Sequence, residues 1–345
     1  MKVTMKDIAE ALDVSVTTVS RAINNQGRIG VSTRKMVIAK ALEMGYELPE
    51  KEEPQIDGKL VGVVFDRRLQ SLATDPFYST VMMGVEKKCK EYNSQVFFHT
   101  IDQPSDERLW SLFTQERLHG LIVVGGDIRN GFVVGLKKRK IPFVLVDNYL
   151  DDVDADAVVT DNAGGMTKIL THLFGLGHEK IGFVGGPLSH PSIAERYETY
   201  CSVLAERGSG RRAEWSWIHS EPGPSIEQGY QAIRFWHQQG IDITAVVADN
   251  DSTAIGILRG CTELGIAVPH DLTITGFDNI ALAEHVSPGI TSVHIHKMEM
   301  GEWAAKRLHE VMEDDDIPIK VTLSTRLIVR GSSGPNSRKS GFATV

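Results

Sequence analysis

Eight short apolar runs alternate with amphipathic stretches from residue 60 onward, and this alternation constrains the fold of the 345-residue chain more than any other feature. Each run is rich in Val, Ile, Leu or Phe and ends in Gly, Asp or Asn, which is typical of strands buried on both faces of a parallel sheet. Helical stretches such as residues 162–177 and 252–265 separate the runs, so we predict a doubly wound α/β fold. The runs are LVGVVFD, SQVFFHTID, LHGLIVVGG, PFVLVDN, AVVTDN, KIGFVGG, TAVVADND and LTITGFDN.

Eight parallel strands are more than one compact sheet would hold, and the pattern restarts near HEKIGFVGG at residues 178–186. We therefore expect two similar lobes that together span residues 60–330. A chain of this length has room for two or three domains. Residues 1–46 show a different pattern, that of short helices, and are expected to form a separate head.

The head begins with a capping signal, because Thr4 is followed three residues later by Asp7 and then by apolar residues at helical spacing. A break at residues 13–14 precedes Ser15, which suits the N-cap of a second helix because its hydroxyl can accept from a backbone N–H. A third helix is expected to begin after Ser32 and to stop at Gly45. The sequence therefore predicts two short helices joined by a tight turn, followed by a third.

The second helix is built from poor helix formers, which suggests that its outer face is chosen for contact with a partner. Short side chains and one Arg share that face, and an Arg can donate two hydrogen bonds to guanine in the major groove. The head carries seven basic and four acidic side chains, although the whole chain has a net charge of −8. A solvated face of a small helical cap is the alternative; the combination favours a helix-turn-helix that reads DNA. The outer-face residues are Val16, Thr17, Ser20, Arg21 and Asn24.

The segment MKDIAEALDVSVTTVSRAINN…STRKMVIAKALEMGY resembles the headpiece of the LacI/GalR family of bacterial sugar-responsive repressors along its whole length. The resemblance implies a helix-turn-helix head and a two-lobed body like that of periplasmic binding proteins. It also implies that Val16, Thr17 and Arg21 read bases. Phosphate or positioning contacts would fall to Thr4, Ser15, Ser20 and Asn24.

Polar residues follow several of the predicted strands, at the sheet edge where ligands of doubly wound folds bind. Carboxylates and amides there suit a ligand rich in hydroxyl groups. One or two of these residues are instead expected to cap the following helix, and Asp251 is the foremost candidate for a cap. These residues are Asp127, Asp147, Asn250, Asp251 and Asp278.

The resemblance extends over the body and implies an effector site there. The segment DPFYSTVMMGVE matches the one whose aromatic side chain lies against the ligand, and SIAERYETY matches one with an Arg that clamps ligand oxygens. His296 lies beside a matched position, which makes it the weakest member. The implied effector-binding residues are Phe77, Tyr78, Asp147, Arg196, Asn250, Asp278 and His296. The sequences of the segments DPFYSTVMMGVE and SVHIHKMEMG are most similar to those of the galactoside-responsive branch of the family.

The segment at residues 47–59 is acidic and interrupted by two prolines, whereas the family has a short hinge helix there that inserts a Leu into the minor groove. Five carboxylates would be repelled by DNA phosphates. The linker is therefore expected either to lie off the DNA or to leave the operator little bent. Residues 331–345 carry no leucine heptads and are expected to be a disordered tail.

Composition excludes several classes of protein. Three widely spaced cysteines suit neither a disulfide framework nor a zinc site, and no apolar run is long enough for a membrane span or a signal peptide. We expect a cytoplasmic homodimer that binds operator DNA and a sugar or glycoside, without a cofactor, a metal or a catalytic site. One alternative is a sugar kinase or dehydrogenase, but no P-loop or dinucleotide fingerprint is present. The other is a periplasmic sugar carrier, which would not need the head.

Overall fold

The computed structural model describes residues 3–24, 29–46, 58–66, 76–101, 118–125, 130–150, 152–208, 213–220, 225–313 and 317–337. The chain divides into two compact units, Met1–Ile56 and Asp57–Val345. They are called the head and the body below and are described separately.

The head contains the three predicted helices, α1 (Met5–Leu12), α2 (Val16–Ile23) and α3 (Val31–Glu43). The predicted capping box is present, since the Thr4 N–H donates to the Asp7 carboxylate at 2.8 Å and the Asp7 N–H donates to the Thr4 hydroxyl. Asp13 makes the turn with a left-handed backbone (φ 51°). Ser15 caps α2 by accepting from the Thr18 N–H at 3.0 Å. The predicted start of α3 is wrong by two residues, because the helix begins after Gly30.

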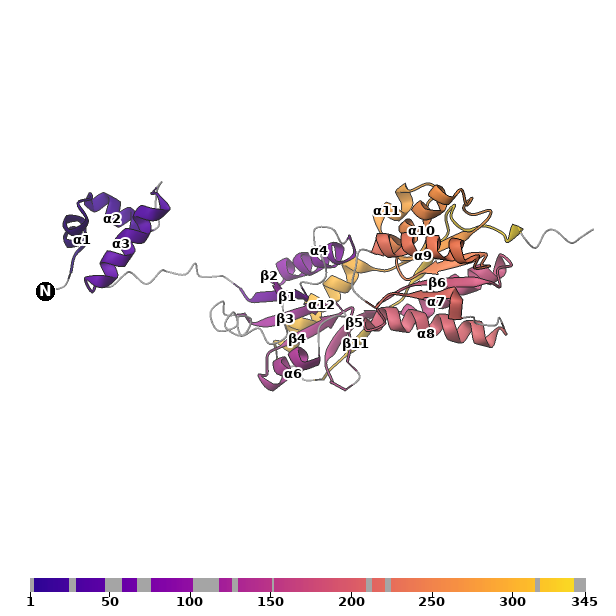
Figure 1. Ribbon diagram of the computed structural model, residues 1–345. Coiled ribbons are helices and arrows are strands. Elements are labelled where there is room, and N and C mark those ends of the chain that lie inside the picture. Colours follow the sequence, from indigo (N-terminus) through magenta and orange to yellow (C-terminus); the bar gives the residue numbers. More distant parts are fainter. Residues whose placement is uncertain are drawn as a thin grey trace, which may run out of the picture. The chain divides into compact units, whose positions relative to one another are not determined.

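The body contains two six-stranded sheets, one in each lobe (Figure 1). The first has the order β11-β5-β4-β3-β1-β2, with every pair of neighbours parallel. The second has the order β12-β10-β9-β8-β6-β7, in which only β12 runs antiparallel to its neighbour. The strands of the first sheet are β1 (Leu60–Asp66), β2 (Gln95–Ile101), β3 (Gly120–Val124), β4 (Phe143–Val146), β5 (Asp156–Thr160) and β11 (Lys320–Leu323). Those of the second are β6 (Ile181–Gly185), β7 (Ser216–Ile218), β8 (Ala245–Ala248), β9 (Thr273–Asp278), β10 (Thr291–His294) and β12 (Arg326–Ile328).

All eight predicted strands are present, and the structure adds β7, β10, β11 and β12. The added strands have only three or four residues each. The side chains of β11 and β12 are half-buried or exposed, so these strands lack the continuous apolar run by which the others were recognised. Their sequence signal is correspondingly weak.

Helices cover both faces of the first sheet. Alternate side chains of β1 point to opposite faces, so Val61 and Val63 pack with α4 (Pro76–Glu91) and α12 (Lys297–Val311). Val64 packs on the other face, with α6 (Asn130–Lys138). The two helices on the first face approach closely at Gly84, where a Cβ atom would lie 2.0 Å from the Met298 carbonyl oxygen.

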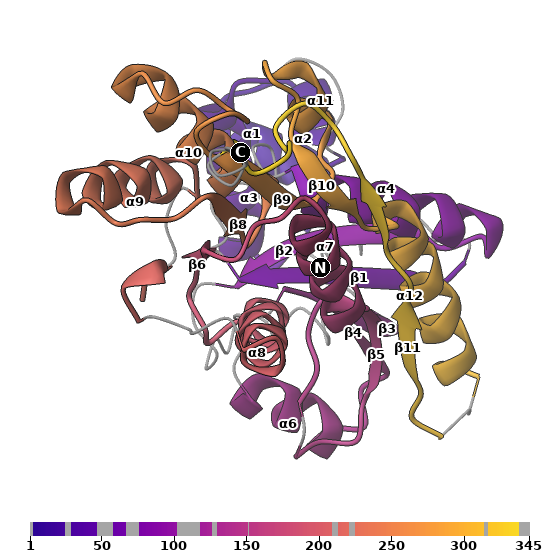
Figure 2. The same ribbon diagram turned by 90° about the vertical axis from the view of Figure 1, so that its right-hand side faces the viewer.

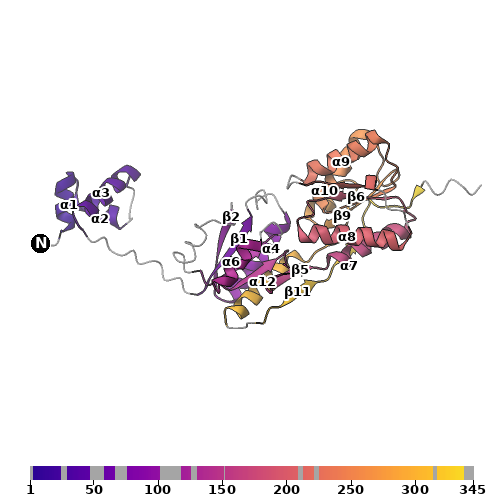
Figure 3. The same ribbon diagram turned by 60° about the horizontal axis from the view of Figure 1, so that its bottom comes forward.

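The second lobe repeats this arrangement. Its sheet lies between α7 (Asn162–Gly175) and α8 (Pro191–Glu206) on one face and α9 (Ser225–Gln239) and α10 (Asp251–Leu264) on the other, as Figures 2 and 3 show. The short 3-10 helix Ala213–Trp215 and α11 (Ala281–His285) complete it. Both lobes are thus three-layered α/β units, as predicted.

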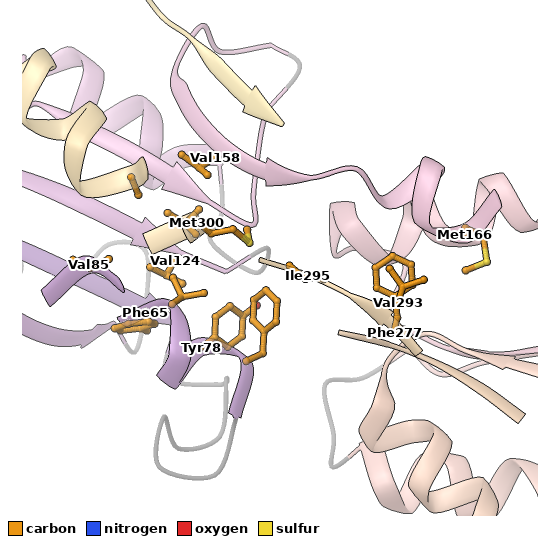
Figure 4. Close-up of a cluster of buried hydrophobic side chains, with 14 of the residues drawn as sticks. Phe65, Tyr78, Val85, Val124, Val158, Met166, Phe277, Val293, Ile295 and Met300 are labelled. Atoms are coloured by element: carbon orange, nitrogen blue, oxygen red, sulfur yellow. The ribbon is translucent and has the colours of Figure 1, made fainter. Parts of the chain in front are cut away.

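The chain crosses between the lobes more than once. It enters the second lobe after β5, returns after β10 to form α12 and β11 of the first lobe, and crosses back into β12. The second lobe therefore begins with α7, earlier than the predicted restart at residues 178–186. Ile295 lies on the crossover between β10 and α12, between an apolar group around Phe65 and another around Phe277 (Figure 4).

The predicted disordered tail is wrong for residues 331–337. Ser332 is fully buried, and its hydroxyl donates to the Ile274 carbonyl at 2.6 Å. The Asn336 N–H donates to the Leu176 carbonyl at 2.9 Å, so the body extends beyond residue 330. Residues 338–345, Asp127 and most of the acidic linker (47–57) lie outside the described residues. None of the described helices has the length and apolar character needed to cross a lipid bilayer.

Candidate functional site

The outer face of α2 is the candidate DNA-binding surface. Val16 is 46% exposed although it is apolar, and Thr17, Arg21 and Asn24 are exposed beside it. On the inner face Val19 and Ala22 are buried in the core of the head. The helix therefore presents short side chains and one cation on a surface held in place by its buried side, which is the geometry a major-groove helix requires.

Three of the hydroxyl residues predicted to contact phosphates also have structural roles in the head. Thr4 and Ser15 cap α1 and α2, respectively. Ser20 accepts a hydrogen bond from the Asn24 side chain at 3.3 Å. These side chains fix the two helix starts and the end of α2, so they would hold the helices in position against a DNA backbone.

Asp147 is the centre of the candidate effector site in the body. It follows β4 in a left-handed conformation (φ 55°), which turns its buried carboxylate toward the second lobe. Oδ1 accepts from the Ser192 hydroxyl at 2.7 Å, and Oδ2 accepts from the Tyr78 hydroxyl at 3.2 Å. His190 Nε2 lies 3.6 Å from Oδ2. One carboxylate of the first lobe thus contacts the start of α8 in the second.

Arg196 lies one helical turn beyond Ser192 on α8, and its guanidinium is buried. Nε donates to Asn162 Oδ1 at 2.8 Å, and an Nη atom donates to the Asp249 carbonyl at 2.6 Å. The other Nη lies 3.4 Å from Asp278 Oδ1, and the guanidinium stacks on the Phe277 ring with its carbon 3.8 Å from the centroid. A planar fork fixed from several sides is a rigid donor for ligand oxygens.

The aromatic side chains predicted to contact the effector are Phe77 and Tyr78. Both are buried in the first turn of α4, and their rings meet edge to face with centroids 5.0 Å apart. Through the Tyr78–Asp147 hydrogen bond they join the Asp147 cluster. The structure places five of the seven predicted effector residues along the first turns of α8 in two groups: Phe77, Tyr78 and Asp147 near Ser192, and Asp278 beside Arg196 one helical turn further.

Asn250 and His296 have different surroundings. Asn250 caps α10, with Oδ1 accepting from the Thr253 N–H at 2.9 Å. The expectation that Asp251 would be the cap is wrong, since Asp251 is the first helical residue and its Oδ2 accepts from the Ile280 N–H at 2.7 Å. His296 precedes α12 and faces Glu299, with Nδ1 3.9 Å from the carboxylate.

Two models of known families match the chain in the same order as its two units. "Bacterial regulatory proteins, lacI family" matches residues 4–48, and "Periplasmic binding protein-like domain" matches residues 170–333. Both units are therefore similar to regulators of the LacI family.

LacI-family relatives match along almost the entire chain. The transcriptional repressor MelR of Bacillus subtilis (strain 168) is 29% identical over 98% of this chain and 99% of its own. Catabolite control protein A of Priestia megaterium is 28% identical over 92% and 95%. Other relatives include repressors named PurR and ExuR, so the likeness does not single out the galactoside-responsive branch.

Solved structures of LacI-family regulators have the same fold. A complex of the regulator CelR with cellobiose has a TM-score of 0.73 and 25% identity, and covers 96% of this chain and 100% of its own. A regulator from Enterococcus faecium with bound ribose has a TM-score of 0.69 and 27% identity, with coverages of 80% and 99%. The lac repressor dimer on operator DNA has a TM-score of 0.72 at 23% identity and covers 97% of this chain and 100% of its own.

The similarity to transcription regulators decides between the alternatives raised by the sequence. This chain is a DNA-binding transcription regulator and not an enzyme, and the expected cytoplasmic location follows from that class. Among the residues that the structure describes, no three His, Cys, Asp or Glu side chains converge as metal ligands.

Sequence reasoning missed several polar residues of this site. Asn162, His190, Ser192 and Asp249 contact the predicted residues directly. The available signal was their position just after β5, β6 and β8, where ligand-binding loops occur.

Two buried polar side chains, Asn148 and Asp249, adjoin the site residues. Burial raises the pKa of Asp249, whereas the Thr253 side chain and the Gly186 N–H, which donates to Oδ2 at 3.1 Å, act in the opposite direction. Neither side-chain amide atom of the buried Asn148 has a hydrogen-bond partner in the described structure. Such atoms are rare in folded proteins and are compatible with a polar ligand nearby.

Proposed function

We propose that this regulator is a repressor whose affinity for operator DNA is controlled by a small sugar or glycoside bound between the two lobes. The observation that carries the proposal is a cluster of polar contacts along the first turns of α8. Ser192 donates to Asp147 of the first lobe, and Arg196, one helical turn further, lies 3.4 Å from Asp278 of the second lobe. A ligand that binds such groups would contact both lobes at once.

The chemistry of the cluster favours a sugar. Hydroxyl groups both donate and accept, so neighbouring hydroxyls can donate to the carboxylates of Asp147 and Asp278 and accept from Arg196. The rings of Phe77 and Tyr78 supply apolar surface for the C–H face of a sugar ring. Two structural relatives of this chain hold cellobiose and ribose. Among sugars, a galactoside is the first candidate, because the segments DPFYSTVMMGVE and SVHIHKMEMG resemble the galactoside-responsive branch of the family.

A sugar would act by changing how the lobes contact each other. Asp147 accepts a hydrogen bond from Ser192 of the opposite lobe. A ligand hydroxyl that competes for Asp147 alters this contact, so the sugar binds one arrangement of the lobes better than another. Coupling of this kind is typically worth about 1–3 kcal/mol.

On DNA, the chain would act as a homodimer with one head on each half of a near-palindromic operator. Val16, Thr17 and Arg21 would contact base edges. Thr4, Ser15, Ser20 and Asn24 would contact or orient the phosphate backbone. The acidic linker at residues 47–59 would lie off the DNA, because its carboxylates would be repelled by phosphates.

The test combines two assays on the full chain. Thermal-shift measurements with galactose, melibiose, cellobiose and ribose should reveal a sugar that raises the unfolding temperature of the body, since a ligand at 100 times its Kd stabilises by about 2.7 kcal/mol. Selection from a random duplex library should recover a near-palindromic sequence whose binding changes when that sugar is added. Turnover of a sugar, or binding to DNA without sequence preference, would contradict the proposal.

A further inference from the structure

Lys297 is a buried lysine at the first position of α12, where the chain has just crossed from the second lobe into the first. Its Nζ donates to the carbonyl oxygen of Asp278, to that of Asn279 at 3.3 Å and to that of Ile295 at 3.4 Å. Each proton of the ammonium therefore has a backbone acceptor. Two of the three acceptors belong to the turn that Asp278, the last residue of β9, makes with Asn279.

That turn has an unusual backbone. Asp278 has φ 96° and Asn279 has φ 51°, a region that side chains with a Cβ rarely adopt. Two further hydrogen bonds hold the turn. The Asn279 N–H donates to the Ser292 hydroxyl at 3.0 Å, and Arg330 donates to Asn279 Oδ1 at 2.8 Å. Strained backbone persists only where its surroundings over-determine it. Lys297, the first residue of α12, contributes hydrogen bonds to the two carbonyls of this turn.

The turn also carries Asp278, whose Oδ1 lies 3.4 Å from Arg196 in the candidate effector site. Lys297 therefore connects two elements of different lobes. The turn belongs to the second lobe, whereas α12 packs on the first lobe against α4 and β4. A movement of Asp278 would change the carbonyls that Lys297 binds, and thereby act on the start of α12.

The charges around Lys297 agree with this role. Burial lowers the pKa of the ammonium, and the carboxylates of Asp278 and Asp251 act in the opposite direction. Asp251 is buried in turn, and its Oδ2 accepts from the Ile280 N–H at the end of the same turn. The cation favours the ionised form of the Asp251 carboxylate, which burial and repulsion by Asp278 disfavour.

We propose that Lys297 is a positioning residue that holds Asp278 in its effector-binding orientation and transmits the position of that side chain to α12. The proposal rests on the proposed function in taking Asp278 as an effector ligand. Its first test is designed to need no sugar.

The first test measures hydrogen–deuterium exchange on the full chain. Lys297→Met removes the ammonium with little change in volume, and the amides of Asn279 and Ile280 should then exchange at least about tenfold faster. Lys306→Met is the matched control, because Lys306 lies on the same helix and is half-exposed beside Trp303. It should leave the turn unchanged. Unchanged exchange at Asn279 and Ile280 in Lys297→Met would overturn the proposal.

The second test measures binding of galactose, melibiose, cellobiose and ribose by calorimetry. Lys297→Met should weaken the binding of a sugar that binds the native chain by at least about tenfold, and should abolish the change that this sugar causes in the exchange of the first turn of α12. A merely structural lysine would leave that change intact, and this result would refute the positioning role. Lys297→Gln keeps a donor and should be intermediate; it replaces the Met variant if that variant does not fold.

The two tests also separate the proposals. If none of these sugars binds the native chain, the sugar assignment fails, whereas the exchange experiment still decides whether Lys297 holds the Asp278 turn.

Discussion

The Ser192 hydroxyl donates to Asp147 Oδ1 at 2.7 Å, and this hydrogen bond joins the first turn of α8 in the second lobe to the residue that follows β4 in the first. Both side chains are buried. A hydrogen bond to a charged group is stronger than one between neutral groups. The same contact therefore fixes the arrangement of the lobes and occupies a carboxylate that a ligand would use.

Replacing Ser192 by Ala should destabilise the body by about 1–3 kcal/mol, because Asp147 Oδ1 loses a donor and stays buried. Urea unfolding of the full chain measures this difference. Ser189→Ala is the control, since Ser189 is exposed just before the same helix. Equal unfolding free energies for the two variants would show that the Ser192–Asp147 bond contributes nothing to the body.

Arg196→Lys should abolish sugar binding while leaving the affinity for DNA without sugar intact. Lysine keeps the charge but not the planar fork, so the contacts with Asn162, Asp249 and Asp278 cannot all be kept. Arg207→Lys, at the exposed end of the same helix, should bind sugar normally. Parallel calorimetry and DNA-binding titrations of the two variants test this. Loss of DNA binding in Arg196→Lys would indicate misfolding.

Arg21→Ala should weaken binding to the selected operator by about 1–3 kcal/mol and relax the preference at one base pair of each half-site. The side chain is exposed, so the head should unfold at an unchanged temperature. Lys35→Ala removes an exposed cation from α3 and should reduce affinity for all sequences alike. Competition with single-base operator variants distinguishes the two effects. A uniform loss in Arg21→Ala would assign Arg21 to the phosphate backbone.

The long strands of this chain could be predicted because burial on both faces leaves a continuous apolar run in the sequence. The return of α12 and β11 to the first lobe could not, since their packing depends on contacts with elements more than 150 residues earlier in the chain. Strand-end carboxylates predicted Asp147 and Asp278 as site residues. Ser192 was missed because only the packing of the two lobes brings it to Asp147.

The confusion of Asn250 with Asp251 has a local cause. Both residues can cap a helix, and they are adjacent. Only the backbone distinguishes them: Asn250 is extended (φ −151°, ψ 173°) and Asp251 is already helical. Asp251 is instead buried below the Asp278 turn. Residue type alone therefore locates the start of this helix only to within one residue.

The stability of the body should depend on pH through two groups that act in opposite directions. Burial, with a smaller contribution from the Asp278 carboxylate, raises the pKa of Asp251 from 3.8 to about 7. Burial and the nearby Lys297 lower the pKa of His294 from 6.5 to about 4. From about pH 4 to about pH 7 the folded chain keeps a proton on Asp251 that the unfolded chain has lost, so this group lowers stability as pH rises.

The sign is reversed for His294. Between about pH 4 and about pH 6.5 the unfolded chain binds a proton at this residue that the folded chain does not, so stability rises with pH and is lost on acidification. The two contributions oppose each other in the native chain. Asp251→Asn keeps an acceptor for the Ile280 N–H but cannot ionise, and should make stability rise with pH over this window. Across this pH window the contribution of Asp251 to the free energy of unfolding changes by at most about 4 kcal/mol.

His294→Gln should have the opposite effect, because it leaves the Asp251 contribution alone and stability then falls as pH rises. Urea midpoints of the native chain and the two variants at about pH 4.5, 6 and 8 measure the slopes. The double variant should show the flattest profile of the four chains, since neither group titrates in it. If Asp251→Asn and His294→Gln shift the profile in the same direction, then at least one of these groups is ionised differently in the folded chain.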